Sequence, residues 1–121
     1  LLALADEALA RSVEVAMVLY PAPSEGVVRL LPPDVELLSL VDADALQWAD
    51  ALYCAGGTQH LAELQGVLRS SGSRVPAHAL VHTPLACGVG ACYGCRMETR
   101  KGARLACLDG PTFPLRELVW T

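Results

Sequence analysis

The sequence predicts an α/β protein, with a partial parallel-sheet domain of the nucleotide-binding type followed by a small β-rich C-terminal segment. Three observations predict this class. Apolar strand-like runs alternate with helical patterns over residues 1–82, as in parallel sheets covered by helices. The chain has 121 residues and is 53% hydrophobic, which suffices for one buried core. From residue 83 the composition changes to glycine, cysteine and short strand-like pieces such as "RMET" and "RLACL".

A helix followed by a strand opens the chain. The helix is predicted over residues 1–11, and the strand is predicted over 13–19, "VEVAMVL", which is rich in branched apolar residues. After a break at "YPAPSEG", the piece "VVRLL" is ambiguous, and "VELLSLV" (35–41) is predicted to be a second strand. The apolar face of the helix consists of Leu1, Leu2, Ala5, Ala8 and Leu9.

The same alternation continues after Asp42. This residue is expected to cap a short helix over 43–48, because its carboxylate can accept from the amides two or three residues on. "ADALYCAGG" (49–57) is predicted to be the third strand, and a helix then runs from Thr58 to the Ser71–Gly72 turn. "PAHALVH" (76–82) is predicted to be the fourth strand. Strands that are apolar on both faces predict a parallel sheet with helices on both sides.

Charge and hydropathy exclude several classes of protein. The net charge is −4, from ten acidic and four basic residues in 1–75 and from three acidic and five basic residues in 76–121. The basic residues are too few for a nucleic-acid interface. No apolar run reaches the ~18 residues of a membrane span, and the acidic start lacks the basic region of a signal peptide. A cytoplasmic protein is expected, and the start without methionine predicts a fragment.

Four of the five cysteines follow the spacing Cys87-x4-Cys92-x2-Cys95-x11-Cys107. The x4 and x2 gaps are those of plant-type ferredoxins, in which four thiolates hold a [2Fe-2S] cluster. Such a cluster needs two thiolates on each iron and a loop that wraps around the sulfides. Gly88, Gly90 and Gly94 lie in this loop, where the lack of Cβ permits positive φ and lets backbone amides approach the sulfurs.

Two other uses of these thiols remain open from the residues. A structural zinc site usually has two Cys-x2-Cys pairs, and only Cys92 and Cys95 have that form. Disulfides need an oxidising compartment, for which the sequence gives no sign. Cys54 lies in an apolar strand and is expected to be a small buried hydrophobe, not a fifth ligand.

Four basic residues also lie between the third and fourth cysteines. Either they are a solvated hairpin tip, or they favour the more negative, reduced form of a cluster. They are Arg96, Arg100, Lys101 and Arg104.

The motifs "ACGVGACYGC", "RLACLDGPTF" and "LRELVW" resemble the C-terminal part of the electron-transfer subunit of the two-subunit, NAD-linked dihydroorotate dehydrogenase, in the ferredoxin reductase superfamily. The resemblance implies that residues 1–82 are a truncated pyridine-nucleotide-binding-like domain. It implies that residues 83–121 are a [2Fe-2S] cluster-binding segment with Cys87, Cys92, Cys95 and Cys107 as ligands. The implied function is electron relay between FAD/NADH and a catalytic FMN-containing partner subunit, in a hetero-oligomer of pyrimidine biosynthesis.

The chain departs from this family at two places. It starts where the glycine-rich phosphate turn should end, and the flavin domain is absent. "YCAGGTQHL" keeps only Gly56 of the family's motif near the nicotinamide, with His60 as a residue that contacts a nucleotide or lies on the surface. FAD and NAD are therefore expected only in a full-length chain, and the fragment alone is expected to lack turnover. Two alternatives remain: a fragment of a hydrogenase or another NAD(P)H oxidoreductase complex, and an interaction domain stabilised by zinc on the four cysteines.

Overall fold

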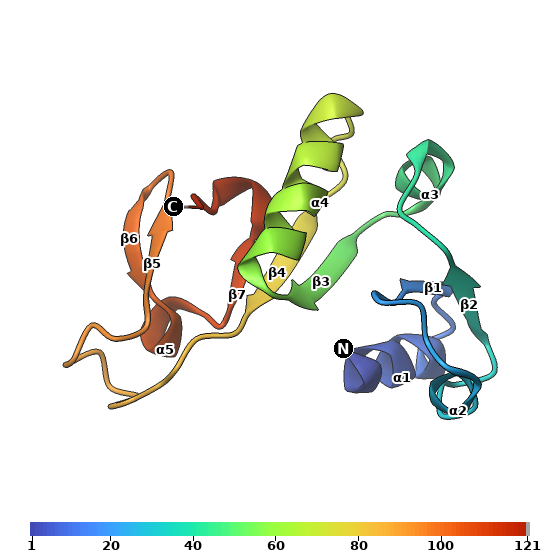
Figure 1. Cartoon of the computed structure of the whole chain (residues 1–121), viewed down its shortest axis with the longest axis horizontal. Coiled ribbons are helices and arrows are strands. Elements are labelled where there is room, and N and C mark those ends of the chain that lie inside the picture. Colours follow the sequence, from blue (N-terminus) through green and yellow to red (C-terminus); the bar gives the residue numbers. More distant parts are fainter. Residues whose placement is uncertain (121) are drawn as a thin grey trace. The chain divides into compact units, whose positions relative to one another are not determined.

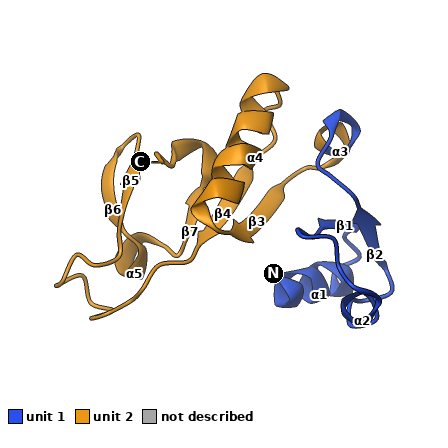
Figure 2. Ribbon diagram, in the orientation of Figure 1, with its two compact units in different colours: residues 1–45 blue, residues 46–121 orange. Residues whose placement is uncertain are grey.

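A computed structural model describes residues 1–120 of the chain and has the predicted α/β composition (Figure 1). Its elements divide into two compact units, 1–45 and 46–121 (Figure 2). This division by compactness joins the third and fourth strands to the cysteine-rich segment. A functional boundary between residues 82 and 83 therefore stays a prediction from sequence character. Among the described residues, every helix is too short or too polar to cross a membrane.

The first unit contains the helix and the two strands that were predicted for it. Helix α1 spans Leu2–Ala10, and strands β1 (Val15–Val18) and β2 (Val35–Leu38) pair in parallel, with Val15 opposite Val35. The ambiguous stretch near "VVRLL" forms helix α2, Glu25–Val28. Both predicted strands are confirmed, and each is shorter than its apolar run in the sequence.

The predicted cap at Asp42 is confirmed. Its Oδ1 accepts a hydrogen bond from the backbone N–H of Ala45 at 2.9 Å, at the start of helix α3, Ala43–Trp48. A carboxylate at this position satisfies one of the amides that the first helical turn leaves without a partner.

The second unit is built on a three-stranded sheet in the order β3-β4-β7. Strands β3 (Leu52–Gly56) and β4 (Ala77–Val81) are parallel, and helix α4 (Thr58–Ser70) connects them. Strand β7 (Thr112–Pro114) runs antiparallel on the other edge of β4. The predicted parallel pairing of the third and fourth strands is confirmed. The four predicted strands form two hydrogen-bonded pairs in separate sheets, however, and the antiparallel β7 was not predicted.

One face of this sheet forms the main core. The side chains of Ala77, Ala79 and Val81 are buried, in the alternating pattern of a strand covered on one side. The cover comes from α4 and from the 3-10 helix η1, Leu115–Glu117, which follows β7. The other fully or nearly buried apolar side chains of the unit include Leu61, Leu68, Phe113, Leu115 and Leu118.

A buried glutamine joins α4 to the C-terminal residues. Gln65 is 4% exposed, and its Nε2 donates to the carbonyl oxygens of Leu115 at 2.6 Å and of Leu118 at 3.0 Å. Both carbonyls lie in or beside η1, outside the strands of the sheet. The glutamine amide therefore satisfies two backbone acceptors inside an otherwise apolar core.

Replacing Gln65 by leucine should destabilise the second unit by about 2 to 4 kcal/mol, because two buried carbonyls lose their donor while the side-chain volume is kept. Urea unfolding followed by circular dichroism measures the loss. Gln59→Leu is the matched control, since Gln59 lies exposed on the same helix and donates to Glu63 at the surface. Equal stability of the two variants would show that the bonds of Gln65 contribute nothing net.

The C-terminal segment differs from the prediction at "RLACL". Strand β5 (Arg96–Thr99) pairs antiparallel with β6 (Gly102–Leu105), but the chain then turns into helix α5, Ala106–Asp109. The predicted strand therefore ends at Leu105. Asp109 explains the change, because its carboxylate accepts from the Leu105 N–H at 2.8 Å and closes one helical turn.

Candidate metal centre

The loop between β4 and β5, together with α5, holds the four predicted cysteines (Figure 1). Cys87, Cys92 and Cys95 lie in this loop, which has no helix or strand, and Cys107 lies in α5. The β5-β6 hairpin brings the third and fourth cysteines together, because its register sets Arg96 opposite Leu105. The Ala106 N–H then donates to the Cys95 carbonyl at 3.0 Å. Residues separated by eleven others in the sequence are thus neighbours.

The thiols associate as two pairs. The side chain of Cys87 hydrogen-bonds to that of Cys92, and the side chain of Cys95 hydrogen-bonds to that of Cys107. The charge of Cys87 also acts on Cys107, so the two pairs lie within electrostatic range of each other. Among the residues that the structure describes, no group of three metal-binding side chains is arranged to hold one metal ion. The four predicted cysteines therefore lie as two neighbouring pairs, and their joint role as ligands stays a prediction.

Backbone amides of the loop point at the sulfurs. The Val89 N–H donates to Cys87 Sγ at 3.5 Å, and the Gly94 N–H donates to Cys92 Sγ at 3.4 Å. The amide of Val89, followed by those of Cys92 and Ala91 and the Cys92 thiol, lowers the pKa of Cys87 to about 6. A thiolate at this position is therefore well populated at neutral pH, as a metal ligand must be.

Backbone amides also donate to the second pair of thiols, Cys95 and Cys107. The Cys107 amide lowers the pKa of Cys95 by donating to its sulfur. The Cys107 thiol itself donates to Cys95, and this bond, followed by desolvation, raises the pKa of Cys107. The pKa values of the two paired thiols are therefore shifted in opposite directions.

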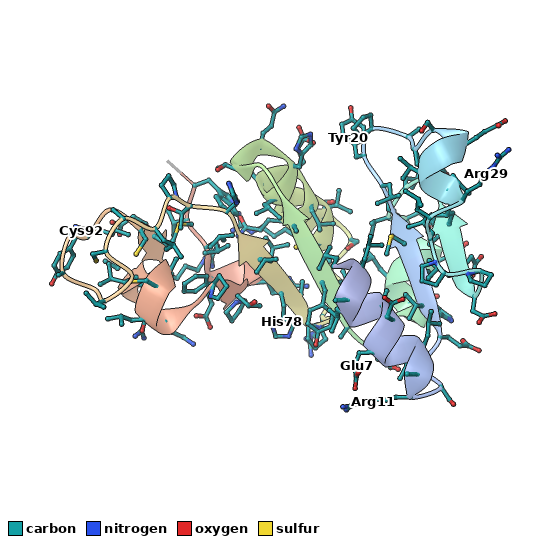
Figure 3. The ribbon with its side chains drawn as sticks, turned by 90° about the horizontal axis from the view of Figure 1, so that it is seen from below. Glu7, Arg11, Tyr20, Arg29, His78 and Cys92 are labelled. Atoms are coloured by element: carbon teal, nitrogen blue, oxygen red, sulfur yellow. The ribbon has the colours of Figure 1, made fainter. Side chains whose placement is uncertain are left out.

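Exposure falls from one side of the thiol cluster to the other. Cys95 is buried at 3% exposure, Cys87 and Cys107 are partly buried, and Cys92 is exposed. Cys92 lies on the outer turn of the loop (Figure 3). One side of the site is therefore closed to water by the protein, and the other side faces the solvent.

The loop needs residues without a Cβ at two positions, as predicted. Gly88 and Gly90 have φ values of +71° and +76°, which L-residues with side chains rarely adopt. Gly94 has no such φ, and its contribution is the amide that donates to Cys92. Tyr93 instead adopts a φ of +58°. No sequence signal marks this tyrosine, because such a conformation is uncommon for its type.

Gly90 is also the place where the loop lies against α5. A Cβ on this residue would meet Leu108 Cδ1 at 2.5 Å and Leu105 Cδ1 at 3.5 Å. The Gly90 amide bonds toward the Cys107 sulfur and lowers the pKa of that thiol. Gly90 therefore connects the three-cysteine loop to the helix that carries the fourth cysteine.

The basic residues of the hairpin are largely paired with carboxylates. Arg96 lies 2.7 Å from Glu98, Arg104 lies 3.5 Å from Asp109, and Lys101 bonds Glu117. The predicted effect of these cations on a cluster is therefore weakened, because each paired carboxylate offsets part of the positive field at the thiols.

The remaining sequence candidates lie away from the thiols. Cys54 is in β3, where its thiol donates to the His78 carbonyl at 3.3 Å, and desolvation raises its pKa to about 11. It is only partly buried, whereas the sequence predicted a small buried hydrophobe. His60 lies in the first turn of α4, with its Cβ 3.8 Å from where a Cβ on Gly56 would stand.

Comparison with known proteins identifies the C-terminal segment. Residues 82–119 match the iron-sulfur cluster binding domain of dihydroorotate dehydrogenase B. All four paired cysteines fall within this stretch. The resemblance that was drawn from the sequence is therefore confirmed for this segment, and so is its iron-sulfur character.

Similar proteins give the same result over a short stretch. The electron transfer subunit of dihydroorotate dehydrogenase B (NAD(+)) from Clostridium acetobutylicum is 42% identical over 45 residues, which are 37% of this chain and 18% of that protein. The putative counterpart from Thermotoga petrophila is 43% identical over 37 residues, or 31% of this chain and 17% of that protein. The matched stretch is thus less than a fifth of these relatives.

A solved structure has a similar fold over nearly the whole chain. A chain of the NADH-dependent reduced ferredoxin-NADP oxidoreductase superposes with a TM-score of 0.70 at 20% identity. The match covers 98% of this chain and 49% of that one. The α/β fold class predicted from the sequence is therefore confirmed.

Proposed function

We propose that the chain relays electrons through a [2Fe-2S] cluster bound by Cys87, Cys92, Cys95 and Cys107, as part of a dihydroorotate dehydrogenase electron-transfer subunit. One observation carries the proposal: four thiols gather as two pairs beneath backbone amides, in a segment that matches an iron-sulfur domain. Two pairs are the donor set that a two-iron cluster requires.

The donor set fits a cluster better than a single ion. The thiols lie as two pairs, and a two-iron cluster takes two thiolates on each iron. We infer that Cys87 and Cys92 would share one iron and that Cys95 and Cys107 would share the other. When bound, such a cluster takes up and releases single electrons, which links flavins that react by two electrons.

The residues of this chain would set the environment of the cluster. Amides at Val89 and Gly94 donate to Cys87 and Cys92, and hydrogen bonds of this kind stabilise negative charge on the sulfurs. The buried Cys95 keeps water from one side, whereas the exposed Cys92 leaves the other side accessible. Electrons would therefore enter or leave on the side of Cys92.

The rest of the predicted relay is a proposal about the longer protein. FAD, NADH and the FMN-containing catalytic subunit would belong to an assembly in which this chain supplies the C-terminal part of one subunit. Residues 1–82 would be the remainder of a pyridine-nucleotide domain, and residues 83–121 the cluster segment.

Analysis of metal and sulfide tests the proposal. Anaerobically prepared chain should contain about two irons and about two acid-labile sulfides, as a [2Fe-2S] cluster requires, and should give an electron paramagnetic resonance signal after reduction by dithionite. Apo-chain reconstituted with iron and sulfide should regain the same visible spectrum. A colourless chain that holds one zinc, and that reconstitution leaves unchanged, would establish the zinc-stabilised domain instead.

A further inference from the structure

The four thiols of the cysteine-rich segment lie as two pairs, each in side-chain contact. Cys87 and Cys92 form the first pair, and Cys95 and Cys107 form the second. Across the described residues, no three metal-binding side chains are arranged around one ion. All four thiols are free, and two thiols in contact are the starting point from which a disulfide forms. The same side chains are therefore suited to a second chemistry, in which they bond one another.

The backbone of the loop holds the first pair together. The chain folds back between Cys87 and Cys92, where Gly88 and Gly90 adopt φ values of +71° and +76°. The amides of Val89 and Cys92 then donate to the Cys87 sulfur. The turn therefore brings the two cysteines together before any bond forms between them.

The β5-β6 hairpin holds the second pair together. Its register sets Arg96 opposite Leu105, and the Ala106 N–H donates to the Cys95 carbonyl at 3.0 Å. The Cys107 amide donates to the Cys95 sulfur. A bond between the sulfurs of Cys95 and Cys107 would therefore join the end of the hairpin to α5 along contacts that already exist.

Exposure sets the order in which the two pairs would react. Cys92 is exposed, Cys87 and Cys107 are partly buried, and Cys95 is only 3% exposed. A small oxidant in solution reaches an exposed thiol first. The first pair should therefore oxidise before the second.

We propose that hydrogen peroxide converts the chain that has not yet received its cluster into a form with two disulfides, Cys87–Cys92 and Cys95–Cys107, and that this reversible change prevents loading. In each pair one sulfur attacks a peroxide oxygen, the O–O bond breaks, and a sulfenic acid and water form. The partner sulfur attacks the sulfenic sulfur, the S–S bond forms, and a second water leaves. Two thiols thus lose two electrons and two protons, and the peroxide gains both.

The pairing would keep this oxidation reversible. A sulfenic acid that meets no thiol is oxidised further to a sulfinic acid, which a thiol reductant does not restore. Here each cysteine has a partner in contact, and a dithiol reductant reopens the resulting bond by exchange. Sulfurs that are bonded to each other offer no thiolate to iron. The effect on loading rests on the proposed function, whereas the pairing itself does not.

Peptide mapping of the peroxide-treated apo-chain tests the connectivity, because four cysteines allow three pairings. Cleavage after Tyr93 and Arg96 separates the first pair from each member of the second. The expected digest has an internal bond in the fragment that carries the first pair, and a bond that links the fragments with Cys95 and Cys107. In both other pairings, the fragment with the first pair is linked to each of the other two.

Cys54 is the internal control in the same chain. Its thiol donates to the His78 carbonyl, outside the cysteine-rich segment. After oxidation and unfolding, one alkylated thiol is expected in each chain, at Cys54. Cys92→Ser should leave Cys87 without a partner and keep the bond of the second pair. Brief treatment of the wild-type chain should close the first pair alone.

Reconstitution tests the effect on loading. The oxidised chain should take up iron and sulfide at least about tenfold more slowly than the reduced chain, and dithiothreitol should restore the rate. The proposal is overturned by either of the other pairings, by thiols that stay free or become sulfinic acids, or by an oxidised chain that loads as fast as the reduced one. In each case a reduced chain that loads iron and sulfide leaves the electron relay standing. A reduced chain that never loads them removes the relay, whatever the pairing.

Discussion

A chain with Cys107 changed to alanine should lose the cluster, with bound iron falling from about two per chain to nearly none after reconstitution. Cys107 is the only one of the four thiols outside the loop, and its side chain and amide both bond Cys95. Without it, one iron would keep a single protein thiolate. Iron analysis and visible absorption after anaerobic reconstitution measure the effect.

Cys54→Ala is the control for this change. It removes a thiol of the same chain, but that thiol donates to the His78 carbonyl, in β4. The spectrum and the iron content should stay as in the wild type, with a loss of stability of about 1 kcal/mol. If the spectrum survived the loss of Cys107 and vanished with Cys54, the ligand assignment would be wrong.

Gly90→Ala should shorten the lifetime of the cluster about tenfold or more in the presence of an iron chelator. Two costs combine: about 1 to 2 kcal/mol for an L-residue at a φ of +76°, and about 1 to 3 kcal/mol for the clash of the new Cβ with Leu108. Both costs move the loop away from α5 and hence from Cys107. The half-time for loss of visible absorption is the measurement.

Two further variants separate these costs. Gly88→Ala has nearly the same φ of +71° but nothing within 4 Å of its Cβ, so it carries the backbone cost alone. The double change Gly90→Ala with Leu108→Ala should recover the part that is due to the clash. Equal effects at Gly88 and Gly90, with no recovery in the double variant, would mean that contact with α5 does not hold the loop.

The parts of the structure that could be predicted depend on local patterns. The Asp42 cap, helix α4 and strands β3 and β4 each follow from the chemistry of a few neighbouring residues. The grouping of the cysteines also follows from local spacing, because a two-iron site constrains the gaps between its ligands. The positive φ of Gly88 and Gly90 was predictable for the same reason.

The parts that could not be predicted depend on contacts between distant residues. β7 has three residues and includes a proline, so it carries no periodicity, and its pairing partner β4 lies about 30 residues earlier. Helix α5 replaces a predicted strand because of one carboxylate, that of Asp109. Gln65 is a common residue on a helix, and only the fold gives it two buried carbonyls to satisfy.

The pairing of β7 with β4 closes the cysteine-rich segment into a loop. The Val81 N–H donates to the Pro111 carbonyl at 3.0 Å, so both ends of the cysteine-rich segment are joined at one sheet. Closing a loop of about 30 residues costs entropy that grows only slowly with its length, and here backbone hydrogen bonds provide the closure. The strand pairing therefore fixes both ends of the cysteine-rich segment at one sheet, and the conformations open to the thiol loop are limited from its two ends.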